Sequence, residues 1–286
     1  MNPHRGIASS VRPVGDPDGE GLRRMSTVRD RAGWVGFREK LRSSTECLLG
    51  TWVKIPALET IEMLAAVGYD FIVLDEEHSP LTLEAAYRAT ALSQALGMHV
   101  LVRTPDRSGN YVQRVLDSGV DGLLIPQVAG VEEARRVVGD MVFAPQGRRG
   151  LGSTSRAGLW GTIPNAEYVR RGSEEIVRGI QLEDAAVLDR LDEIMEIPGL
   201  DAVFLGTGDL GLSTGLSPDD PVFQGYIDRF LAAAKAHGLP RGTAVASGPA
   251  AREAAERGFT FVMISNDAKM FADGAKAALA GAVRER

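Results

Sequence analysis

YDFIVLDEEH (residues 69–78) begins as an apolar run and finishes on ionisable side chains. An apolar run without polar alternation is typical of a strand that a parallel sheet buries on both faces. Three later runs finish in the same way, HVLVR (99–103), VRGIQLE (177–183) and LDAVFLGTGD (200–209). The carboxyl ends of the strands in a parallel barrel share one face, and that face carries the chemistry of such enzymes. The pattern therefore predicts an active site there.

The same unit repeats along the chain. Eight short apolar stretches are candidate strands, at residues 48–53, 70–75, 99–103, 121–126, 178–183, 202–206, 242–246 and 259–264. Helical patterns separate them, and many end in the glycine that commonly closes a helix. This alternation predicts a (β/α)8 TIM barrel as a single domain over residues 36–286. An open doubly wound sheet is the alternative, but it usually carries a glycine fingerprint after its first strand, and GTWVKIPALE (50–59) contains none.

Composition narrows the class of protein. The chain has 286 residues, 44% of them hydrophobic, which is enough for one large core. Its net charge of -6 argues against nucleic acid or an anionic membrane as the main partner. The sequence lacks the apolar run of ~18 residues that a membrane span needs. The single cysteine, Cys47, cannot form an internal disulfide, so we expect a cytoplasmic protein.

Two segments depart from the repeat. Residues 1–35 are rich in Gly, Pro, Arg and Asp and have no apolar period, so we predict a disordered N-terminal extension. Residues 143–176, which include GRRGLGS (147–153), are too long for a simple connection. We expect a flexible loop whose arginines face the site or a neighbouring subunit. Phosphate binding is the less favoured alternative, because the segment is not a Walker motif and does not directly follow a strand.

Two carboxylates are expected to meet at the barrel mouth. Glu183 and Asp209 lie just beyond consecutive strands, so their side chains should be neighbours. Two carboxylates without a nearby His or Cys form a hard-ligand set that suits Mg2+ or Mn2+, with water or substrate oxygens in the remaining positions. A pair of surface acids, or one acid paired with a loop arginine, is the alternative.

A second group of residues points to proton transfer. A histidine that moves protons needs a carboxylate on one ring nitrogen to fix its tautomer, which leaves the other nitrogen free to act. Asp75 lies three residues before His78 and is a candidate for that carboxylate, although Glu76 or Glu77 would compete. A solvated acidic turn with an incidental histidine is the alternative.

Three further strand residues are candidates for substrate binding. Arg103 closes its strand and must face an anion, a carboxylate side chain or solvent. A structural salt bridge to Asp75 or Glu77 is the alternative. Trp52, at the end of the first strand, either walls the pocket or belongs to the core. Gln181 shares a face of its strand with Glu183, so both side chains are expected to point into the mouth.

Together these motifs resemble the HpcH/HpaI family of metal-dependent pyruvate aldolases, which are 4-hydroxy-2-oxoheptanedioate aldolase-like enzymes. The resemblance runs from about Phe37 to the C-terminus. Each motif is short, but their order and their strand-end positions make chance similarity improbable. The most specific parts are GTW (50–52), LDEEHSP (74–80), VR (102–103), RRGLGS (148–153), QLE (181–183) and FLGTGDLG (204–211).

The resemblance implies a barrel of the phosphoenolpyruvate/pyruvate type with a divalent cation, Mg2+ or Mn2+ and also Co2+ as a candidate. It implies a homo-oligomer, a trimer or a hexamer. It implies that Glu183 and Asp209 bind the metal, that Asp75 and His78 form the proton-transfer pair, and that Arg103 stabilises an enolate. The implied reaction is the reversible cleavage of a 4-hydroxy-2-oxo acid to pyruvate and an aldehyde, through a metal-bound pyruvate enolate.

The resemblance also implies substrate contacts. Gln181 would orient the oxo acid, Trp52 would lie near the aldehyde, and backbone N–H groups at Gly208 and Asp209 would hold the carboxylate. The family commonly reads G-P-[AS]-D-L where this chain has GTGDL (206–210), so the rigidity of that carboxylate contact is open. Val53-Lys54 is also atypical, and acceptor preference is expected to differ accordingly.

Three alternatives remain open from the sequence. The same site would also serve an oxaloacetate decarboxylase, since that reaction generates the same enolate. A Schiff-base aldolase would need a lysine at the mouth, and Lys54 is the candidate near a strand end. A barrel that binds oxo acids without catalysis is the third, and the altered GTGD segment is the feature in its favour.

Overall fold

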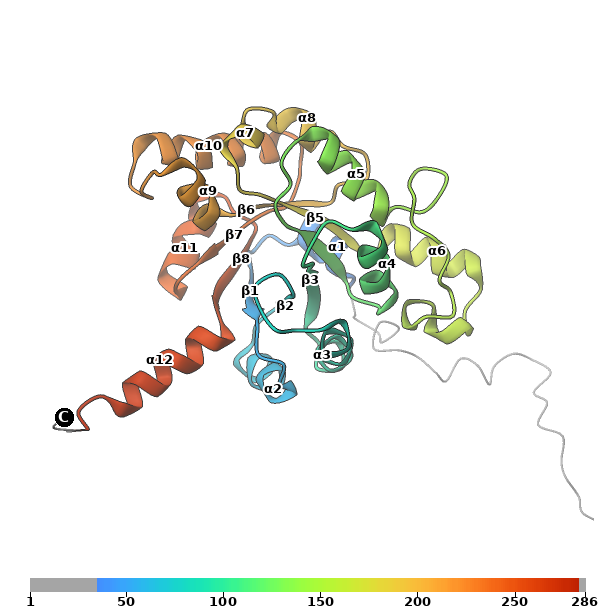
Figure 1. The fold of residues 1–286 in the computed structure, drawn as a ribbon, viewed down its shortest axis with the longest axis horizontal. Coiled ribbons are helices and arrows are strands. Elements are labelled where there is room, and N and C mark those ends of the chain that lie inside the picture. The colour runs from blue at the N-terminus through green and yellow to red at the C-terminus, as the bar shows by residue number, and fades with distance from the viewer. Residues whose placement is uncertain (1–34, 283–286) are drawn as a thin grey trace, which may run out of the picture. The chain divides into compact units, whose positions relative to one another are not determined.

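Eight parallel strands close into a barrel in chain order (Figure 1). The computed structural model describes residues 35–282. The barrel closes because β1 pairs with both β2 and β8. The strands are β1 (Leu48–Val53), β2 (Phe71–Asp75), β3 (His99–Arg103), β4 (Gly122–Ile125), β5 (Val177–Leu182), β6 (Ala202–Leu205), β7 (Arg241–Val245) and β8 (Phe261–Asn266).

Helices cover the outside of the strands (Figure 1). Their strand-facing side chains, with the outward side chains of the strands, form one large aliphatic core. The helices are α1 (Phe37–Ser43), α2 (Leu58–Val67), α3 (Leu83–Ala95), α4 (Gly109–Asp117), α5 (Val131–Met141), α6 (Asn165–Glu174), α7 (Ala185–Leu188), α8 (Leu191–Met195), α9 (Thr207–Thr214), α10 (Pro221–Ala236), α11 (Gly248–Arg257) and α12 (Asp267–Leu279).

Large and small side chains alternate inside the barrel. Phe71 and Phe261 fill the interior, and each lies opposite a glycine on the neighbouring strand. A Cβ atom at Gly50 would lie 2.5 Å from the Phe71 ring, and one at Gly242 would lie 2.1 Å from the Phe261 ring. The interior is therefore packed solid below the mouth.

Helix α1 closes the end of the barrel opposite the mouth. Phe37 is fully buried and its ring stacks on that of His99 with centroids 4.8 Å apart. Arg38 and Arg178 both pair with buried Asp201, at 2.6 Å in each case. His99 is thus a core residue at the amino end of β3.

The (β/α)8 prediction is confirmed, and the open-sheet alternative is wrong because β1 and β8 pair. The predicted strands agree with the observed ones to within two residues at either end. The predicted disordered extension covers residues 1–35. Residues 1–34 lie outside the described part of the chain, which begins at Val35. Within residues 35–282, no helix has the length and apolar character needed to cross a membrane.

Helix α12 extends away from the barrel instead of covering it (Figure 1). Its first residue, Asp267, is buried and the described side chains after Met270 are exposed. Phe271 exposes 73% of its surface and Leu279 exposes 60%. The helix therefore presents large apolar side chains to its surroundings within a single chain.

Candidate active site

A cavity of about 400 Å³ opens at the carboxyl ends of the strands. Side chains from six strands and from the loops after them form its wall. The lining residues are Trp52, Lys54, Arg103, Gln181, Phe204, Gly206, Thr207, Gly208, Asp209, Ala244, Val245, Ala246, Ser265 and Asn266. The cavity thus contains five of the residues predicted for the site.

Arg103 is held by two acids. Its Nε and Nη2 atoms donate to the Asp75 carboxylate at 2.9 and 2.8 Å, and Nη1 lies 3.1 Å from Glu77 Oε2. Burial alone would raise the pKa of Asp75, but the hydrogen bonds and charges of Arg103 and Lys54 outweigh it and hold that pKa below its ordinary value. A guanidinium has five N–H donors, so donors remain for a ligand in the cavity.

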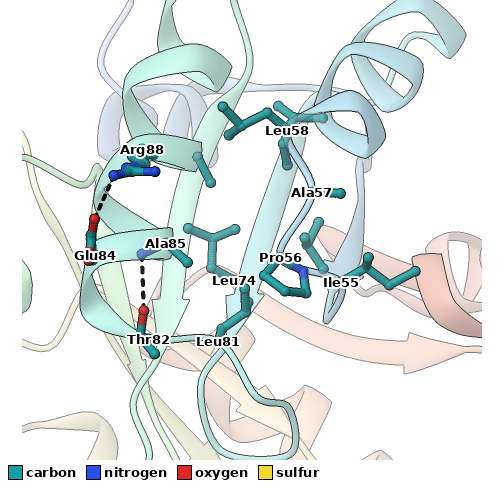
Figure 2. Close-up of a pocket in the computed structure, with 13 residues that line it drawn as sticks. Ile55, Pro56, Ala57, Leu58, Leu74, Leu81, Thr82, Glu84, Ala85 and Arg88 are labelled. Atoms are coloured by element: carbon teal, nitrogen blue, oxygen red, sulfur yellow. Dashed lines mark hydrogen bonds and ion pairs between the residues drawn. The ribbon is translucent and has the colours of Figure 1, made fainter.

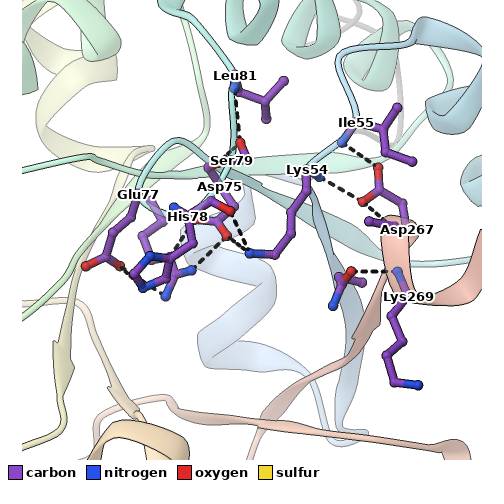
Figure 3. A network of polar contacts seen from close by, with 12 residues as sticks. Lys54, Ile55, Asp75, Glu77, His78, Ser79, Leu81, Asp267 and Lys269 are labelled. Carbon is purple, nitrogen blue, oxygen red and sulfur yellow. Dashed lines mark hydrogen bonds and ion pairs between the residues drawn. The ribbon is translucent and has the colours of Figure 1, made fainter. Parts of the chain in front are cut away.

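His78 has a different carboxylate partner from the one the sequence suggests (Figure 3). Its main-chain N–H donates to Asp75 Oδ1 at 3.2 Å, while its ring Nε2 lies 3.7 Å from Glu77 Oε2. Asp75 is fully buried and already accepts from Arg103 and Lys54. The expected ring contact with Asp75 is therefore replaced by one with Glu77, and the ring remains 55% exposed.

Glu183 is buried at the end of β5 between two donors. Its Oε1 accepts the main-chain N–H of Gln127 at 2.6 Å, and its Oε2 accepts the amide of Gln181. Burial, together with the negative charges of Asp209 and Glu77, raises the pKa of Glu183 to about 6 despite the lowering effect of the two hydrogen bonds. An additional positive charge near Glu183 would relieve this repulsion.

Asp209 lies in the first turn of α9 and lines the cavity. Gly206, at the start of this helix, has no room for a side chain, because a Cβ there would lie 2.7 Å from Glu183 Oε2 and 3.0 Å from Gln181 Nε2. Gly208 by contrast has open space around it and lies within the helix. The segment is therefore helical from Thr207 onward, with Gly206 as its cap, and the extra glycine does not loosen it into a loop.

The donor set fits a hard divalent cation. Glu183 and Asp209 supply two carboxylates, and the Oε1 atom of Gln181 is buried without a hydrogen-bond partner among residues 35–282. The described residues contain no group of three or more His, Cys, Asp or Glu side chains that could hold a metal. Mg2+ and Mn2+ suit such a site, because they accept one or two protein carboxylates and fill their other positions with water or substrate oxygens.

Trp52 lies at the base of the cavity. The Arg103 guanidinium lies over the Trp52 ring at 4.2 Å from its centroid. The Trp52 and Phe204 rings meet in an edge-to-face contact. The indole is 8% exposed. Trp52 is therefore both a core residue and part of the cavity wall, so the two readings of the sequence are compatible.

The arginines of GRRGLGS lie elsewhere. Arg149 is buried over the Phe143 ring, and Arg148 pairs with Asp140 of α5 at 2.8 Å. Neither arginine lines the cavity, so the expectation that they face the site is wrong: Arg149 is buried in the helix layer, and Arg148 is exposed on its surface. That they face a neighbouring subunit stays a prediction. A second cavity, of about 280 Å³, lies between α2 and α3 (Figure 2). Its wall is mainly aliphatic, so it is a less suitable reaction site.

Three residues at the mouth were not assigned to the site from the sequence. Glu77 accepts from Gln127 Nε2 at 2.7 Å and contacts Arg103, and Lys54 Nζ lies 2.5 Å from Asp75 Oδ2. Gln127 follows β4 and has a φ of 52°, an uncommon backbone conformation for a residue with a side chain. The position of Lys54 could be inferred from the sequence, because it lies two residues after inward-facing Trp52 and therefore on the same face of the chain. Gln127 directly follows an apolar run, as the predicted residues do.

The chain is similar to known proteins in both sequence and structure. The sequence model of the HpcH/HpaI aldolase/citrate lyase family matches residues 48–274. A 2-keto-3-deoxy-L-rhamnonate aldolase of Escherichia coli (strain K12 / DH10B) is 32% identical over 241 residues, which are 83% of this chain and 89% of the relative.

Two solved structures of HpcH/HpaI proteins are similar to the structure of this chain. One, from Burkholderia cenocepacia J2315, has a TM-score of 0.79 and 28% identity over 85% of this chain and 97% of its own. The other, from Desulfitobacterium hafniense DCB-2, has a TM-score of 0.78 and 27% identity over 86% of this chain and 98% of its own.

Proposed function

Because this chain belongs to the HpcH/HpaI aldolase/citrate lyase family and is an aldolase, we propose that it cleaves a 4-hydroxy-2-oxo acid reversibly to pyruvate and an aldehyde with a divalent metal ion. The observation that carries this proposal is the shared cavity. Arg103, Gln181 and Asp209 line it, and buried Glu183 bonds to Gln181. A cation at one side and a guanidinium at the other suit a substrate on which negative charge develops.

A divalent cation held by Glu183 and Asp209 would supply Lewis-acid stabilisation of that charge when bound. Arg103 would stabilise the same charge from the side of Asp75, with its fork already fixed in place by two acids. The Gln181 amide would orient the oxo acid. The main-chain N–H groups at the start of α9, at Gly208 and Asp209, would bind the carboxylate, since the first N–H groups of a helix lack intrahelical partners.

His78 would move the proton to or from the 4-hydroxyl group. Its ring is exposed and near Glu77, so one ring nitrogen can be oriented by that carboxylate while the other faces the substrate or a water. Asp75 would act on Arg103 and on the main chain of His78. Trp52 and the side chains from β7 and β8 would face the aldehyde.

The first substrate to test is 2-keto-3-deoxy-L-rhamnonate, because the E. coli relative is named for its action on that compound. We also propose a homo-oligomer, a trimer or a hexamer, in which contacts between chains cover α12. The exposed apolar side chains Phe271 and Leu279 support this, since apolar side chains that one chain leaves exposed together commonly mark an interface. Sedimentation velocity of the full chain tests it, and a monomer would contradict it.

The proposed chemistry is tested by exchange of the pyruvate methyl protons in D2O, followed by NMR. Metal-stripped protein should be inactive, and Mg2+ or Mn2+ should restore exchange. Glu183→Gln should abolish it, while Glu193→Gln, at an exposed acid on α8, should behave like the wild type. His78→Ala should slow cleavage of the substrate far more than exchange. Exchange that needs no metal, or that survives Glu183→Gln, would contradict the proposal.

A further inference from the structure

Lys54 connects two parts of the mouth that the proposed function uses. It follows β1, and its side chain points toward β2 (Figure 3). The ammonium donates to Asp75 Oδ2 at 2.5 Å and to the main-chain carbonyl of His78 at 3.2 Å. One side chain thus bonds to the carboxylate that holds Arg103 and to the turn that carries His78.

The main chain of Lys54 is itself held in place. Its N–H donates to Asp267 Oδ1 at 2.8 Å, and the N–H of Ile55 donates to Asp267 Oδ2 at 3.0 Å. Asp267 is the buried first residue of α12. The segment after β1 is therefore anchored at its backbone before the side chain reaches across to Asp75.

Within the Asp75–His78 turn, the Glu77 side chain is held by Arg103 and Gln127, and the constraints beyond it are fewer. The His78 N–H bonds to Asp75 Oδ1 at 3.2 Å, and the Ser79 hydroxyl bonds to the Asp75 carbonyl. The carbonyl of His78 is tied to the barrel through Lys54. The His78 side chain is more than half exposed, so the ring is placed by its backbone more than by packing.

We propose that Lys54 is a positioning residue, which holds the Asp75–His78 turn so that the His78 ring stays at the mouth of the cavity. An ammonium that forms an ion pair with fully buried Asp75 is charged and has no lone pair for attack on a carbonyl. The contacts therefore give Lys54 a role different from that of a Schiff-base nucleophile. The kinetic consequence of this role rests on the proposed aldol function, but the positioning of the turn by Lys54 does not.

The test compares three variants of the full chain. Lys54→Met removes the charge and keeps the length, Lys54→Arg keeps the charge, and Lys269→Met is the control. Lys269 lies on the same helix as Asp267, is exposed, and pairs with Asp273 at 2.6 Å. Its side chain points away from Lys54 (Figure 3). Hydrogen exchange measured by mass spectrometry reports protection of the 75–81 turn without any need for activity.

In Lys54→Met we expect faster amide exchange in residues 75–81 and a fall in kcat for cleavage of 2-keto-3-deoxy-L-rhamnonate on the order of tenfold to a hundredfold. KM and pyruvate proton exchange with Mn2+ should stay within about threefold, because Arg103 keeps its two acids. Lys54→Arg should recover part of both losses. Lys269→Met should match the wild type in every measurement.

Unchanged protection of the turn in Lys54→Met, or equal losses in proton exchange and cleavage, would overturn the proposal. Borohydride trapping of pyruvate on Lys54 would also overturn it, since the amine would then be a nucleophile. If the wild type fails to exchange pyruvate protons with metal, the proposed function fails. The amide exchange of the 75–81 turn still decides the role of Lys54 in that case.

Discussion

Glu76 is predicted to make the protein less stable as the pH rises. It directly follows β2 and is 5% exposed, and neither carboxylate oxygen has a hydrogen-bond partner among residues 35–282. Tyr111 of α4 is close enough to favour the ionised form slightly, but its geometry falls short of a hydrogen bond. Burial dominates and raises the pKa of Glu76 from 4.5 to about 7. A buried carboxyl without partners is easier to keep protonated than ionised.

The magnitude follows from linkage. Between pH 4.5 and 7 the folded state holds a proton on Glu76 that the unfolded state has released, so the free energy of unfolding falls as the pH rises. At about 1.4 kcal/mol per pH unit, the difference between 4.5 and about 7 corresponds to about 3 kcal/mol. That contribution is fully present below pH 4.5 and is lost above pH 7.

Replacing Glu76 with glutamine removes the titration and keeps the shape. The melting temperature of Glu76→Gln minus that of the wild type should increase from pH 5 to pH 8. The increase should be about 2–4 °C for each kcal/mol of unfolding free energy that the wild type loses over this range. Any fixed cost of a buried amide cancels in this comparison, and so does the raised pKa of Glu183, which both proteins share. Glu62→Gln, at an exposed acid on α2, is the matched control and should give no such change. A difference between Glu76→Gln and the wild type that stays constant from pH 5 to pH 8 would refute the reasoning.

Two further predictions concern metal binding and the glycines. The affinity for Mn2+ should be nearly constant above pH 7 and should fall as the pH drops through about 6, because a proton then competes for Glu183, and calorimetric titration would show this. An affinity that does not change between pH 7.5 and pH 5 would exclude Glu183 as a ligand. Gly50→Ala should lower the free energy of unfolding by about 1–3 kcal/mol, because its Cβ meets the Phe71 ring. Gly208→Ala should raise it by up to about 1 kcal/mol with activity retained, since the space is open and alanine favours a helix. Urea unfolding compares the two, and equal effects would contradict the packing argument.

The barrel could be predicted because its signal is local. Each strand is a short apolar run, and four of these runs finish on ionisable residues, so the ends of β2, β3 and β5 and the start of α9 are visible in the sequence. The cavity residues Arg103, Gln181 and Asp209 were found for that reason. Helix α1 was missed because its role, closing the far end of the barrel, depends on contacts with His99 that no local pattern reveals.

The pairing of side chains at the mouth could not be predicted in the same way. The sequence offers a salt bridge from Arg103 to Asp75 or Glu77 as an alternative, and the structure contains both, but the sequence gives no sign that Lys54 also bonds to Asp75. That outcome depends on the directions of long side chains from neighbouring strands. Gln127 escaped notice for a similar reason, since its contact with Glu183 is made by a main-chain N–H in a left-handed conformation.

The solid interior of the barrel has a kinetic consequence. Phe204 lines the cavity, and the rings of Phe261, Phe71 and Phe37 follow it one against the next toward the far end, so the described part of the barrel is filled there. Reactants therefore enter and leave the cavity through its mouth at the carboxyl ends of the strands. Whichever reactant rests on Phe204 must arrive before the other and depart after it. Two-substrate kinetics in the condensation direction should accordingly follow a compulsory order, with the deeper reactant first in and last out.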